Sequence, residues 1–426
     1  MPLALAAVLW RGLRDRQYWR GLAQRLGFGA ALPAPSIWLH AVSLGEMSAA
    51  APLLRALRLR FPEIPLVVTT ATPAGRARAA ALIEGSADIR FLPYDTPGSV
   101  RRFLKRIRPR TAIIMETELW PNLLRECERD GVPVLLASAR LSAKSVTQYR
   151  RFGSLFAGVF SKNLFVAAQS AEDAERFRSI GAAAERTVVV GNVKFDVGVD
   201  AAIAQAGRAL REALSGTRPV WIAGSTHAGE EEQLLDAHAL LLASIPNSVL
   251  LLVPRHKDRF AAVAELLARR GVKFARRSGM ASGAEARFPS DAPVLLVDTV
   301  GELATLYASA DVAFVGGSLV PTGGHNLLEP AALGLPVLTG PSYFNGKEIA
   351  RLLLARGAAL EVKSAADLAA VLQRLLAEPA TSKQIGSIGK EIIAANRGSV
   401  GKLLALIEPW LPGAELQTAE AGRASR

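Results

Sequence analysis

Short apolar runs and longer amphipathic segments alternate along most of the chain. In the first half, runs rich in Val, Ile and Leu predict strands at 37–42, 66–70, 89–92, 112–115, 134–138, 164–168 and 188–190. Segments of helical length separate these runs, at 46–60, 75–84, 97–107, 143–160 and 171–180, with a further helix that begins near Pro121. Strands that alternate with helices predict a parallel sheet with helices on both faces.

The second half repeats this pattern after an Ala-rich helical segment at 199–215. Its predicted strands lie at 220–223, 248–253, 294–297, 312–315 and 336–338. A single hydrophobic core seldom grows beyond about 250–300 residues, and the chain has 426. The pattern therefore predicts an α/β protein with two doubly wound, Rossmann-like domains, 31–200 and 216–390, joined by a linker at 201–215.

The net charge of +13 is concentrated in two basic clusters. Residues 101–110 hold six Lys or Arg, and the first predicted helix carries five arginines against a single aspartate. Such clusters attract polyanions, either nucleic acid or an anionic membrane. Aromatic residues make up only 6% of the chain, so nucleic acid, which such proteins bind by base stacking, is the weaker candidate. The alternative of a basic protein with solvated helix faces stays open.

The N-terminal segment, 1–30, is predicted to be an amphipathic helix that lies in a membrane interface. Ten uncharged residues precede Arg11, whereas a helix that crosses a bilayer needs about 20 apolar residues. No small-residue cleavage site follows, while arginines and the pair Tyr18 and Trp19 do, a pattern typical of interfacial helices. We expect peripheral attachment to a membrane at its cytoplasmic face.

Cysteine and histidine usage limits two other kinds of site. The single cysteine, Cys127, excludes an intramolecular disulfide framework and suits a reducing compartment. The sequence contains no CxxC or HExxH pattern, and its five histidines are widely scattered. It therefore predicts no metal site and no cofactor.

The stretch 314–340, FVGGSLVPTGGHNLLEPAALGLPVLTG, is the most informative for function. Four glycines follow the strand at 312–315, namely Gly316, Gly317, Gly323 and Gly324. Glycine lets the backbone approach a ligand, and the helix that starts near Asn326 directs its positive end at an anion. Glu329, one turn into that helix, can bind a ribose diol. With His325 in the same loop, a nucleotide-sugar site explains the cluster better than an ordinary strand–loop–helix turn.

Three more loops of the second half follow predicted strands. They are Gly224, Ser225, Thr226 and His227, then Arg255, His256 and Lys257, and finally the segment 298–303. Ligands of doubly wound sheets bind outside the carboxyl ends of strands. We therefore expect phosphate contacts from the second loop and a ribose or base contact from the third.

The first half places carboxylates at equivalent strand ends. Glu46 begins a helix after the strand at 37–42, and Glu116 and Glu118 directly follow the strand at 112–115. Carboxylates beside a buried strand are costly to desolvate without a partner, and Lys194, after the last strand of this half, is the candidate partner. Each carboxylate could alternatively serve as a helix cap, because negative charge complements the dipole at a helix N-terminus.

Seven motifs resemble, in order and spacing, those of the bacterial Kdo transferases: SLGE, METELWP, SARLS, NVKFD, GSTHAGEE, LVPRH and GGSLVPTGGHNLLEP. Members of this family transfer 3-deoxy-D-manno-octulosonic acid (Kdo) from CMP-Kdo to a lipid A precursor, lipid IVA, during lipopolysaccharide biosynthesis at the cell inner membrane. The resemblance covers nearly the whole chain. It implies a GT-B architecture, in which two Rossmann-like domains face each other across a cleft and the segment 391–426 returns as a helix to the first domain.

The resemblance also implies roles for individual residues. Glu46 matches the catalytic base, and Glu116 and Lys194 match positions that stabilise the transition state. The CMP-binding segments match Pro254, Arg255, Val300, Gly301, Glu302, Asn326, Leu327, Leu328 and Glu329. We expect an inverting displacement without a metal, since no DxD triplet follows a predicted strand. The expected partners are CMP-Kdo, the lipid A precursor and an anionic inner-membrane surface.

Two motifs depart from the family pattern, and two other interpretations stay open. Ser138 replaces the commoner asparagine in SARLS, and Ala74 replaces the second threonine of TPTG. One alternative is a GT-B-type hydrolase or epimerase that acts on a nucleotide sugar, expected to be UDP-linked, without a lipid acceptor. The other is a non-catalytic basic module for anionic surfaces, which would have no need of Glu46.

Overall fold

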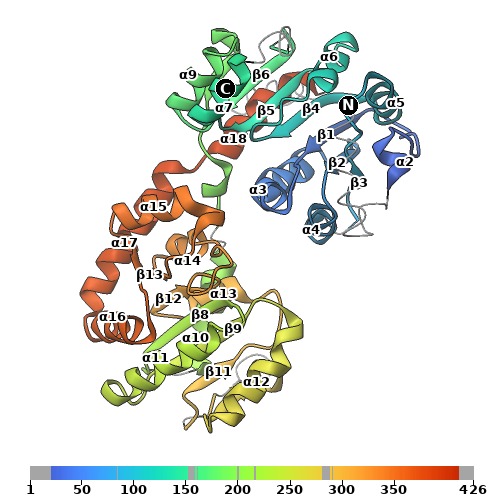
Figure 1. Ribbon diagram of the computed structural model, residues 1–426. Helices are drawn as coiled ribbons and strands as arrows, with labels where there is room; N and C mark the ends of the chain where they lie inside the picture. The colour runs from blue at the N-terminus through green and yellow to red at the C-terminus, as the bar shows by residue number, and fades with distance from the viewer. Residues whose placement is uncertain are drawn as a thin grey trace, which may run out of the picture. The chain divides into compact units, whose positions relative to one another are not determined.

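The computed structural model describes residues 21–83, 85–151, 159–160, 162–198, 201–214, 217–280, 288–289 and 291–411. The chain divides into two compact units, the first made of Met1–Asp196 with Asn396–Arg426 and the second of Val197–Ala395. Each unit contains a parallel sheet between helices (Figure 1), which confirms the predicted α/β class with two Rossmann-like units. The predicted interfacial helix lies mostly outside the described residues, which begin at residue 21.

The first sheet has the strand order β3-β2-β1-β4-β5-β6-β7, and neighbouring strands are parallel. Its strands are β1 (Ser36–His40), β2 (Leu66–Thr70), β3 (Asp88–Phe91), β4 (Pro109–Met115), β5 (Val134–Ala139), β6 (Leu164–Ala168) and β7 (Thr187–Val189). All the strands predicted in this half are found. The chain starts at β1, builds outward to β3 and crosses back to β4, so the loops after β1 and β4 flank the point at which the strand order reverses.

Helices cover both faces of the first sheet. One core lies under α3 (Leu44–Arg60), α4 (Pro73–Ile83) and α18 (Ser399–Ile407). The other lies under α5 (Pro97–Ile107), α6 (Pro121–Arg129), α7 (Ala143–Arg151) and α9 (Ala171–Arg178). Short helical turns complete the described part of the unit: α2 (Leu22–Arg25), η2 (Ala184–Arg186), η3 (Val193–Phe195) and η8 (Glu408–Trp410).

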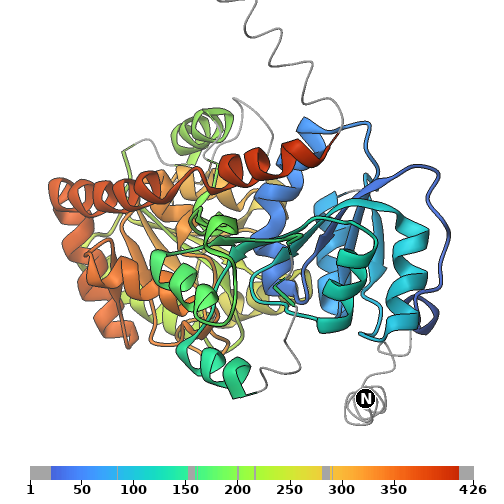
Figure 2. The same cartoon turned by 90° about the horizontal axis from the view of Figure 1, so that it is seen from above.

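Helix α18 is the return of the chain to the first unit, where it lies beside α3 (Figure 2). The Gly398 N–H donates to Asp196 Oδ1 at 2.6 Å, and the Val400 N–H donates to Asp196 Oδ2 at 2.5 Å. Asp196 is the residue at which the chain leaves this unit. One carboxylate therefore joins the exit and the re-entry of the chain.

The second sheet has the order β10-β11-β9-β8-β12-β13-β14, again with parallel neighbours. Its strands are β8 (Val220–Thr226), β9 (Val249–Pro254), β10 (Phe274–Arg276), β11 (Val294–Leu296), β12 (Val312–Val315), β13 (Val337–Thr339) and β14 (Ala359–Glu361). The central strands match the prediction. The two edge strands, β10 and β14, are missing from it.

The helices of the second unit also pack on both faces of its sheet. They are α10 (Ala201–Leu214), α11 (Glu231–Ser244), α12 (Phe260–Arg269), α13 (Leu303–Ala308), α14 (Leu328–Leu333), α15 (Lys347–Ala355), α16 (Ala365–Ala377) and α17 (Pro379–Asn396). Short turns η4 (Lys257–Arg259), η5 (Arg277–Gly279) and η7 (Phe344–Gly346) lie in the loops. Separate apolar cores lie on the two faces.

Helix α10 corrects the prediction of a linker at 201–215. It packs on α13, where Gly207 lies so close to Ala308 that a Cβ at position 207 would come within 2.3 Å of the Ala308 Cβ. Arg211 Nη2 forms an ion pair with Asp311 Oδ2 at 2.8 Å. The segment is therefore a packed helix of the second unit.

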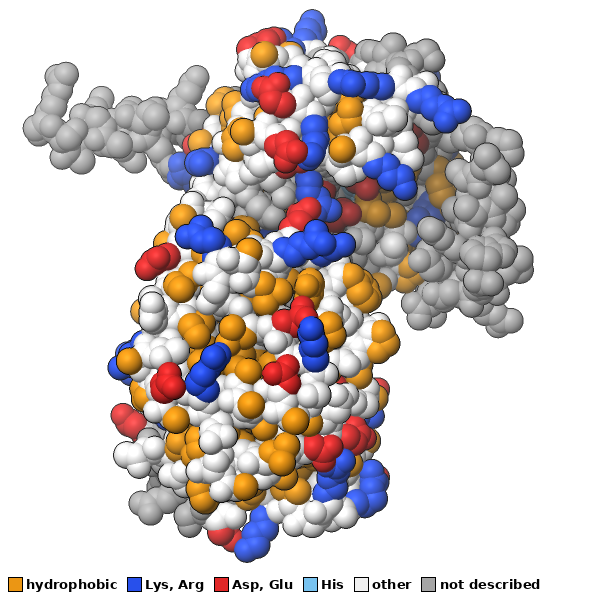
Figure 3. Space-filling view, turned by 60° about the vertical axis from the view of Figure 1, so that its left-hand side comes forward, with side chains coloured by type: hydrophobic (Ala, Val, Ile, Leu, Met, Phe, Trp, Pro, Cys, Tyr) orange, Lys and Arg blue, Asp and Glu red, His pale blue; other side chains and the backbone are white. Residues whose placement is uncertain are grey.

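The basic run at 101–110 is largely occupied by neighbouring backbone. Arg102, Arg106 and Arg108 each donate to backbone carbonyl oxygens within the segment 26–33, which precedes β1. On the face shown in Figure 3, Lys and Arg side chains lie among Asp and Glu side chains. These three arginines thus hold the segment 26–33 against α5 and the residue that follows it. Contact between this basic run and anionic lipid stays a prediction. Among the described helices, none combines the length and the apolar character that a bilayer span requires.

Candidate functional site

Glu46 is held at the start of α3 by a pair of hydrogen bonds. Ser43 Oγ accepts from the Glu46 N–H at 3.3 Å, and Glu46 Oε2 accepts from the Val42 N–H at 2.8 Å. The arrangement resembles a capping box, in which Ser and Glu three residues apart satisfy free N–H groups at a helix start. The helix cap, which is the alternative to a catalytic role for Glu46, is therefore present. It also fixes the carboxylate at the carboxyl end of β1.

The surroundings of Glu46 favour its neutral form. Burial raises the pKa of Glu46 from 4.5 to about 7, and the hydrogen bond from Val42 opposes this shift. The carboxylates of Glu118 and Glu116 raise the pKa further, whereas Lys194 lowers it. A general base works best when its pKa lies near the working pH, so Glu46 has the properties of a base at neutral pH.

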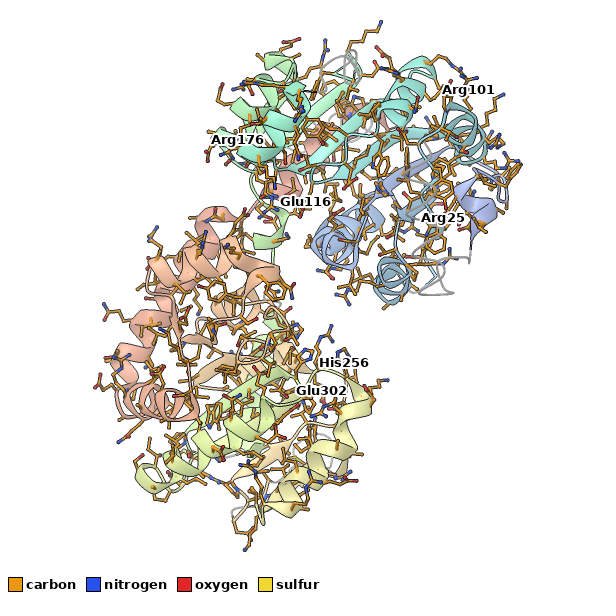
Figure 4. The ribbon with its side chains drawn as sticks, in the orientation of Figure 1. Arg25, Arg101, Glu116, Arg176, His256 and Glu302 are labelled. Carbon is orange, nitrogen blue, oxygen red and sulfur yellow. The ribbon has the colours of Figure 1, made fainter. Side chains whose placement is uncertain are left out.

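Glu116 and Lys194 form an ion pair at the same edge of the first sheet. Glu116 (Figure 4) follows β4, and its Oε1 accepts from Lys194 Nζ at 3.1 Å. Lys194 lies in η3, which packs against α3, so the loops after β1, β4 and β7 bring Glu46, Glu116 and Lys194 to one edge. Burial and the Glu116 carboxylate raise the pKa of Glu118, a neighbour to which the sequence assigns no separate role.

A β-bulge shapes one of these strand ends in each unit. Ser138 in β5 has φ 53° and Ser225 in β8 has φ 61°, and both lie at a break in strand register. Bulges and left-handed backbone at residues with a Cβ are concentrated near functional sites. Ser138 Oγ accepts from the Val193 N–H at 3.4 Å, so the first bulge helps to place Lys194. Neither bulge has a signal in the sequence.

The glycine loop after β12 is closed by a carboxylate of the protein. Glu230 is fully buried and accepts from the N–H groups of Gly317 at 2.7 Å, Ser318 at 3.0 Å and Leu319 at 2.9 Å. Gly316 lies against β8, where a Cβ would come within 2.6 Å of the Ser225 carbonyl oxygen. These findings correct the expectation that the first glycines admit a ligand. The absence of side chains at these glycines instead makes room for β8 and for the Glu230 carboxylate.

Three histidines meet beside this loop, although they are far apart in the sequence. His227 follows β8, His256 follows β9 and His325 ends the glycine loop. The Nε2 atoms of His227 and His325 lie 2.8 Å apart in nearly parallel rings, and the His256 ring lies 5.5 Å from that of His227. Burial is the main reason why the pKa of His227 is lowered and that of His325 falls to about 4. The sequence indicates each histidine but not their contact.

The residues that the resemblance assigns to CMP lie at strand ends of the second sheet. Pro254 ends β9, and the Arg255 N–H donates to the Thr226 carbonyl oxygen at 3.0 Å, which leaves the exposed Arg255 side chain at the carboxyl end of β9. Val300 is 64% exposed, and Gly301 has φ 94°. This exposed apolar side chain, in the loop after β11, suits contact with a flat ring.

Glu302 and Glu329 already have partners within the protein. Glu302 (Figure 4) accepts from Arg277 Nη2 at 2.7 Å and from Thr299 Oγ1. Asn326 Nδ2 donates to Glu329 Oε1 at 3.1 Å, so the two polar side chains hold each other.

Asn326 also contacts the first residue of the helix that follows it, α14. Asn326 Oδ1 accepts from the Leu328 N–H at 3.1 Å, and Leu327 and Leu328 are buried. Because the side chains of Leu327 and Leu328 are buried, only the backbone groups of these two residues can contact a nucleotide. In the part of the chain that the structure describes, no group of three or more His, Cys, Asp or Glu is arranged to hold a metal ion.

Comparisons with known proteins identify the family. A family model described as 3-Deoxy-D-manno-octulosonic-acid transferase (kdotransferase) matches residues 20–197, and one described as Glycosyl transferases group 1 matches residues 293–392. The 3-deoxy-D-manno-octulosonic acid transferase of Haemophilus influenzae is 39% identical over 415 residues, 96% of this chain and 96% of that protein. The enzyme of the same name from Bordetella pertussis is 40% identical over 425 residues, 96% of this chain and 97% of that protein. The chain belongs to the Kdo transferase family.

This membership settles the class of activity and agrees with the fold. A solved glycosyltransferase from Rickettsia africae superimposes on this Kdo transferase with a TM-score of 0.53 at 13% identity, over 90% of this chain and 100% of that one. At this identity the likeness shows the fold alone, and it confirms the expected GT-B class. As a Kdo transferase, the protein is a glycosyltransferase rather than a non-catalytic basic module.

Proposed function

We propose that the protein transfers Kdo from CMP-Kdo to a lipid A precursor, lipid IVA, with inversion at the anomeric carbon and without a metal ion. The observation that carries this proposal is the Glu46 carboxylate, which has a pKa of about 7 beside the Glu116–Lys194 ion pair. Family membership supports Kdo as the transferred sugar. The resemblance of the sequence motifs supports CMP as the carrier.

In the proposed reaction, Glu46 acts as the general base. An acceptor hydroxyl attacks the anomeric carbon of Kdo while Glu46 takes its proton. The bond between this carbon and the phosphate oxygen breaks, and its electron pair leaves with CMP. Attack opposite to the leaving group inverts the configuration in one step, so no covalent sugar–enzyme intermediate is needed.

Charge develops at two places in this reaction, and each unit offers groups that can stabilise one of them. Positive charge grows on the sugar ring, where the Glu116 carboxylate, fixed by Lys194 at 3.1 Å, can oppose it. Negative charge grows on the departing phosphate, where Arg255 and the neighbouring pair of His227 and His325 can oppose it. A monophosphate leaving group carries less charge than a diphosphate, and these side chains can stabilise it without a metal ion.

We further propose that the protein works at the cytoplasmic face of the inner membrane, because its acceptor is a glycolipid. The surplus of +13 charges supports attachment to an anionic surface. Arg102, Arg106 and Arg108 are engaged with backbone, whereas Lys105 and Arg110 are exposed in the same run. The exposed pair is the better candidate for contact with lipid head groups.

The test incubates the purified protein with CMP-Kdo and tetra-acylated lipid A precursor, with and without EDTA, and measures product masses. We expect a Kdo-bearing glycolipid in both reactions. The Glu46→Gln variant should bind CMP and lose most turnover, whereas Glu63→Gln, the same change at an exposed position of the first unit, should keep it. Free Kdo without a glycolipid product would favour the hydrolase alternative, and loss of activity in EDTA would contradict the metal-free mechanism.

A further inference from the structure

The contact between His227 and His325 determines how many protons the two rings hold. Their Nε2 atoms lie 2.8 Å apart, and at this distance one nitrogen must donate and the other accept, so a single proton lies between them. No other described residue forms a hydrogen bond with the Nδ1 atom of either ring. In the neutral pair, one Nδ1 carries a proton and the other does not. The bare Nδ1 is the place where an additional proton can bind.

Burial, and after it the positive neighbours, keep the pair neutral when no ligand is bound. Burial, followed by His227, Arg255 and His256, lowers the pKa of His325 to about 4. Burial, followed by His256, Arg255 and Arg259, lowers the pKa of His227. An additional proton therefore needs an anion that offsets these charges.

The carboxylates beside the pair do not supply that anion. Glu230 accepts a hydrogen bond from the backbone N–H of His227 at 3.3 Å, and its oxygens also accept from the backbone N–H groups of the glycine loop. Glu231 is buried and paired with Arg259 at 3.0 Å. Both carboxylates are thus engaged with other groups, so the charge of an additional proton on the pair must be offset by an external anion.

A phosphate monoester fits this requirement. Its second ionisation lies near pH 6, so it carries close to two negative charges at neutral pH, whereas a phosphate that links a sugar to a nucleoside carries one. Arg255 and a protonated histidine pair together supply two positive charges. We propose that His227 and His325 act as one proton-accepting unit that binds the nucleotide phosphate and takes up one proton as this phosphate gains its second charge.

This inference rests on the proposed function, and its proton balance is complete. When the bond between sugar and phosphate breaks, the electron pair stays on the phosphate oxygen. The hydroxyl proton of the acceptor goes to Glu46. The histidine pair takes its own proton from solvent and returns it when the nucleotide leaves. Nucleotide affinity should therefore fall as the pH rises through the pKa of the occupied pair.

The experiment is calorimetry of CMP binding to the full chain at about pH 7, in buffers with different ionisation enthalpies. After correction for the ionisation of free CMP, we expect uptake of about one proton per CMP and no uptake with cytidine, which lacks the phosphate. His227→Gln and His325→Gln should each reduce uptake at least about threefold and weaken CMP binding about tenfold. His256→Gln removes a neighbouring ring outside the 2.8 Å contact, and uptake should persist.

The outcomes separate this inference from the function on which it rests. CMP that binds without proton uptake, or uptake that survives both His227→Gln and His325→Gln, contradicts the pair and leaves the proposed transfer intact. Failure of CMP to bind contradicts both. The imidazole nitrogen signals of the wild-type protein provide a test that needs no variant, since CMP must convert two histidine rings from neutral to shared cationic signals. Unchanged signals would overturn the inference.

Discussion

Replacing Glu46 by Gln is expected to stabilise the first unit while it removes most of the turnover. Burial raises the pKa of Glu46 from 4.5 to about 7, so the ionised carboxylate opposes folding. At about 1.4 kcal/mol for each pH unit between these two values, the upper limit of this cost is about 3 kcal/mol. Glu46 keeps some contact with water, which screens its charge, and we expect Gln to add about 1–2 kcal/mol. The Gln side-chain oxygen can still accept from the Val42 N–H.

The stabilisation by Glu46→Gln is expected to increase with pH. Between the unfolded pKa of 4.5 and the folded pKa of about 7, folded wild-type protein holds a proton that the unfolded chain has released. Wild-type stability therefore falls as the pH rises through this window. Above it, Glu46 is ionised in both states and Gln gives its full advantage. Below it, Glu46 is neutral in both states and the advantage disappears.

Thermal unfolding at about pH 5 and about pH 8 provides the measurement. The two proteins are compared on the same transition, because a chain of two units need not unfold in one step. At about 2–4 °C per kcal/mol, the Tm of Glu46→Gln should exceed that of wild type by about 2–8 °C at the higher pH and by clearly less at the lower. Glu63→Gln should leave the Tm unchanged at both. Equal stabilisation at the two pH values, or none at about pH 8, would refute the reasoning.

Three further predictions concern the neighbours of these groups. Lys194→Met removes a charge that lowers the pKa of Glu46, so the acidic limb of the kcat/KM profile should move to higher pH. Turnover should fall about 10²-fold, and Lys194→Arg should restore both properties in part. Gly316→Ala brings a Cβ within 2.6 Å of a backbone carbonyl oxygen and should cost about 1–3 kcal/mol in urea unfolding, whereas Gly401→Ala, in an open helical position, should add about 0.5–1 kcal/mol. Glu230→Gln replaces an acceptor by a donor among backbone N–H groups and should cost about 1–3 kcal/mol, with the Tm as the measurement.

Most of the strands that the sequence predicts are central strands, although the edge strands β3 and β7 of the first sheet are predicted as well. β1, β2 and β5 are buried along their full length, and such strands are continuous apolar runs. β10 and β14 pair on one side only, and most of their residues are only partly buried. Phe-Ala-Arg and Ala-Leu-Glu carry no apolar run, so periodicity cannot distinguish these edge strands from loops.

The candidate site was predictable as a set of strand ends and, for one ion pair, as a contact, because Lys194 was the expected partner of the carboxylates and pairs with Glu116 at 3.1 Å. Glu116 directly follows an apolar strand, and Glu46 and Lys194 lie in the short helical segments after two others. They can be named because, in parallel sheets, these strand ends share one edge. The histidine cluster could not be foreseen, since its distances depend on a bulge at Ser225 and on the path of the glycine loop. Neither feature leaves a pattern in the sequence.

Glu230 illustrates the same limit and has a consequence for the donor site. It lies in a run of three glutamates, and nothing in their order marks it as the one that enters the glycine loop. Burying this carboxylate is costly, and the three N–H groups of the loop, with that of His227, offset the cost. The loop is thereby fixed, but its first amides are no longer available to a phosphate. Positive side chains, Arg255 and the histidines, must then supply the attraction. Nucleotide affinity should therefore keep falling as the pH rises above the second ionisation of the phosphate, near pH 6, where a phosphate loop built from backbone N–H groups no longer responds to pH.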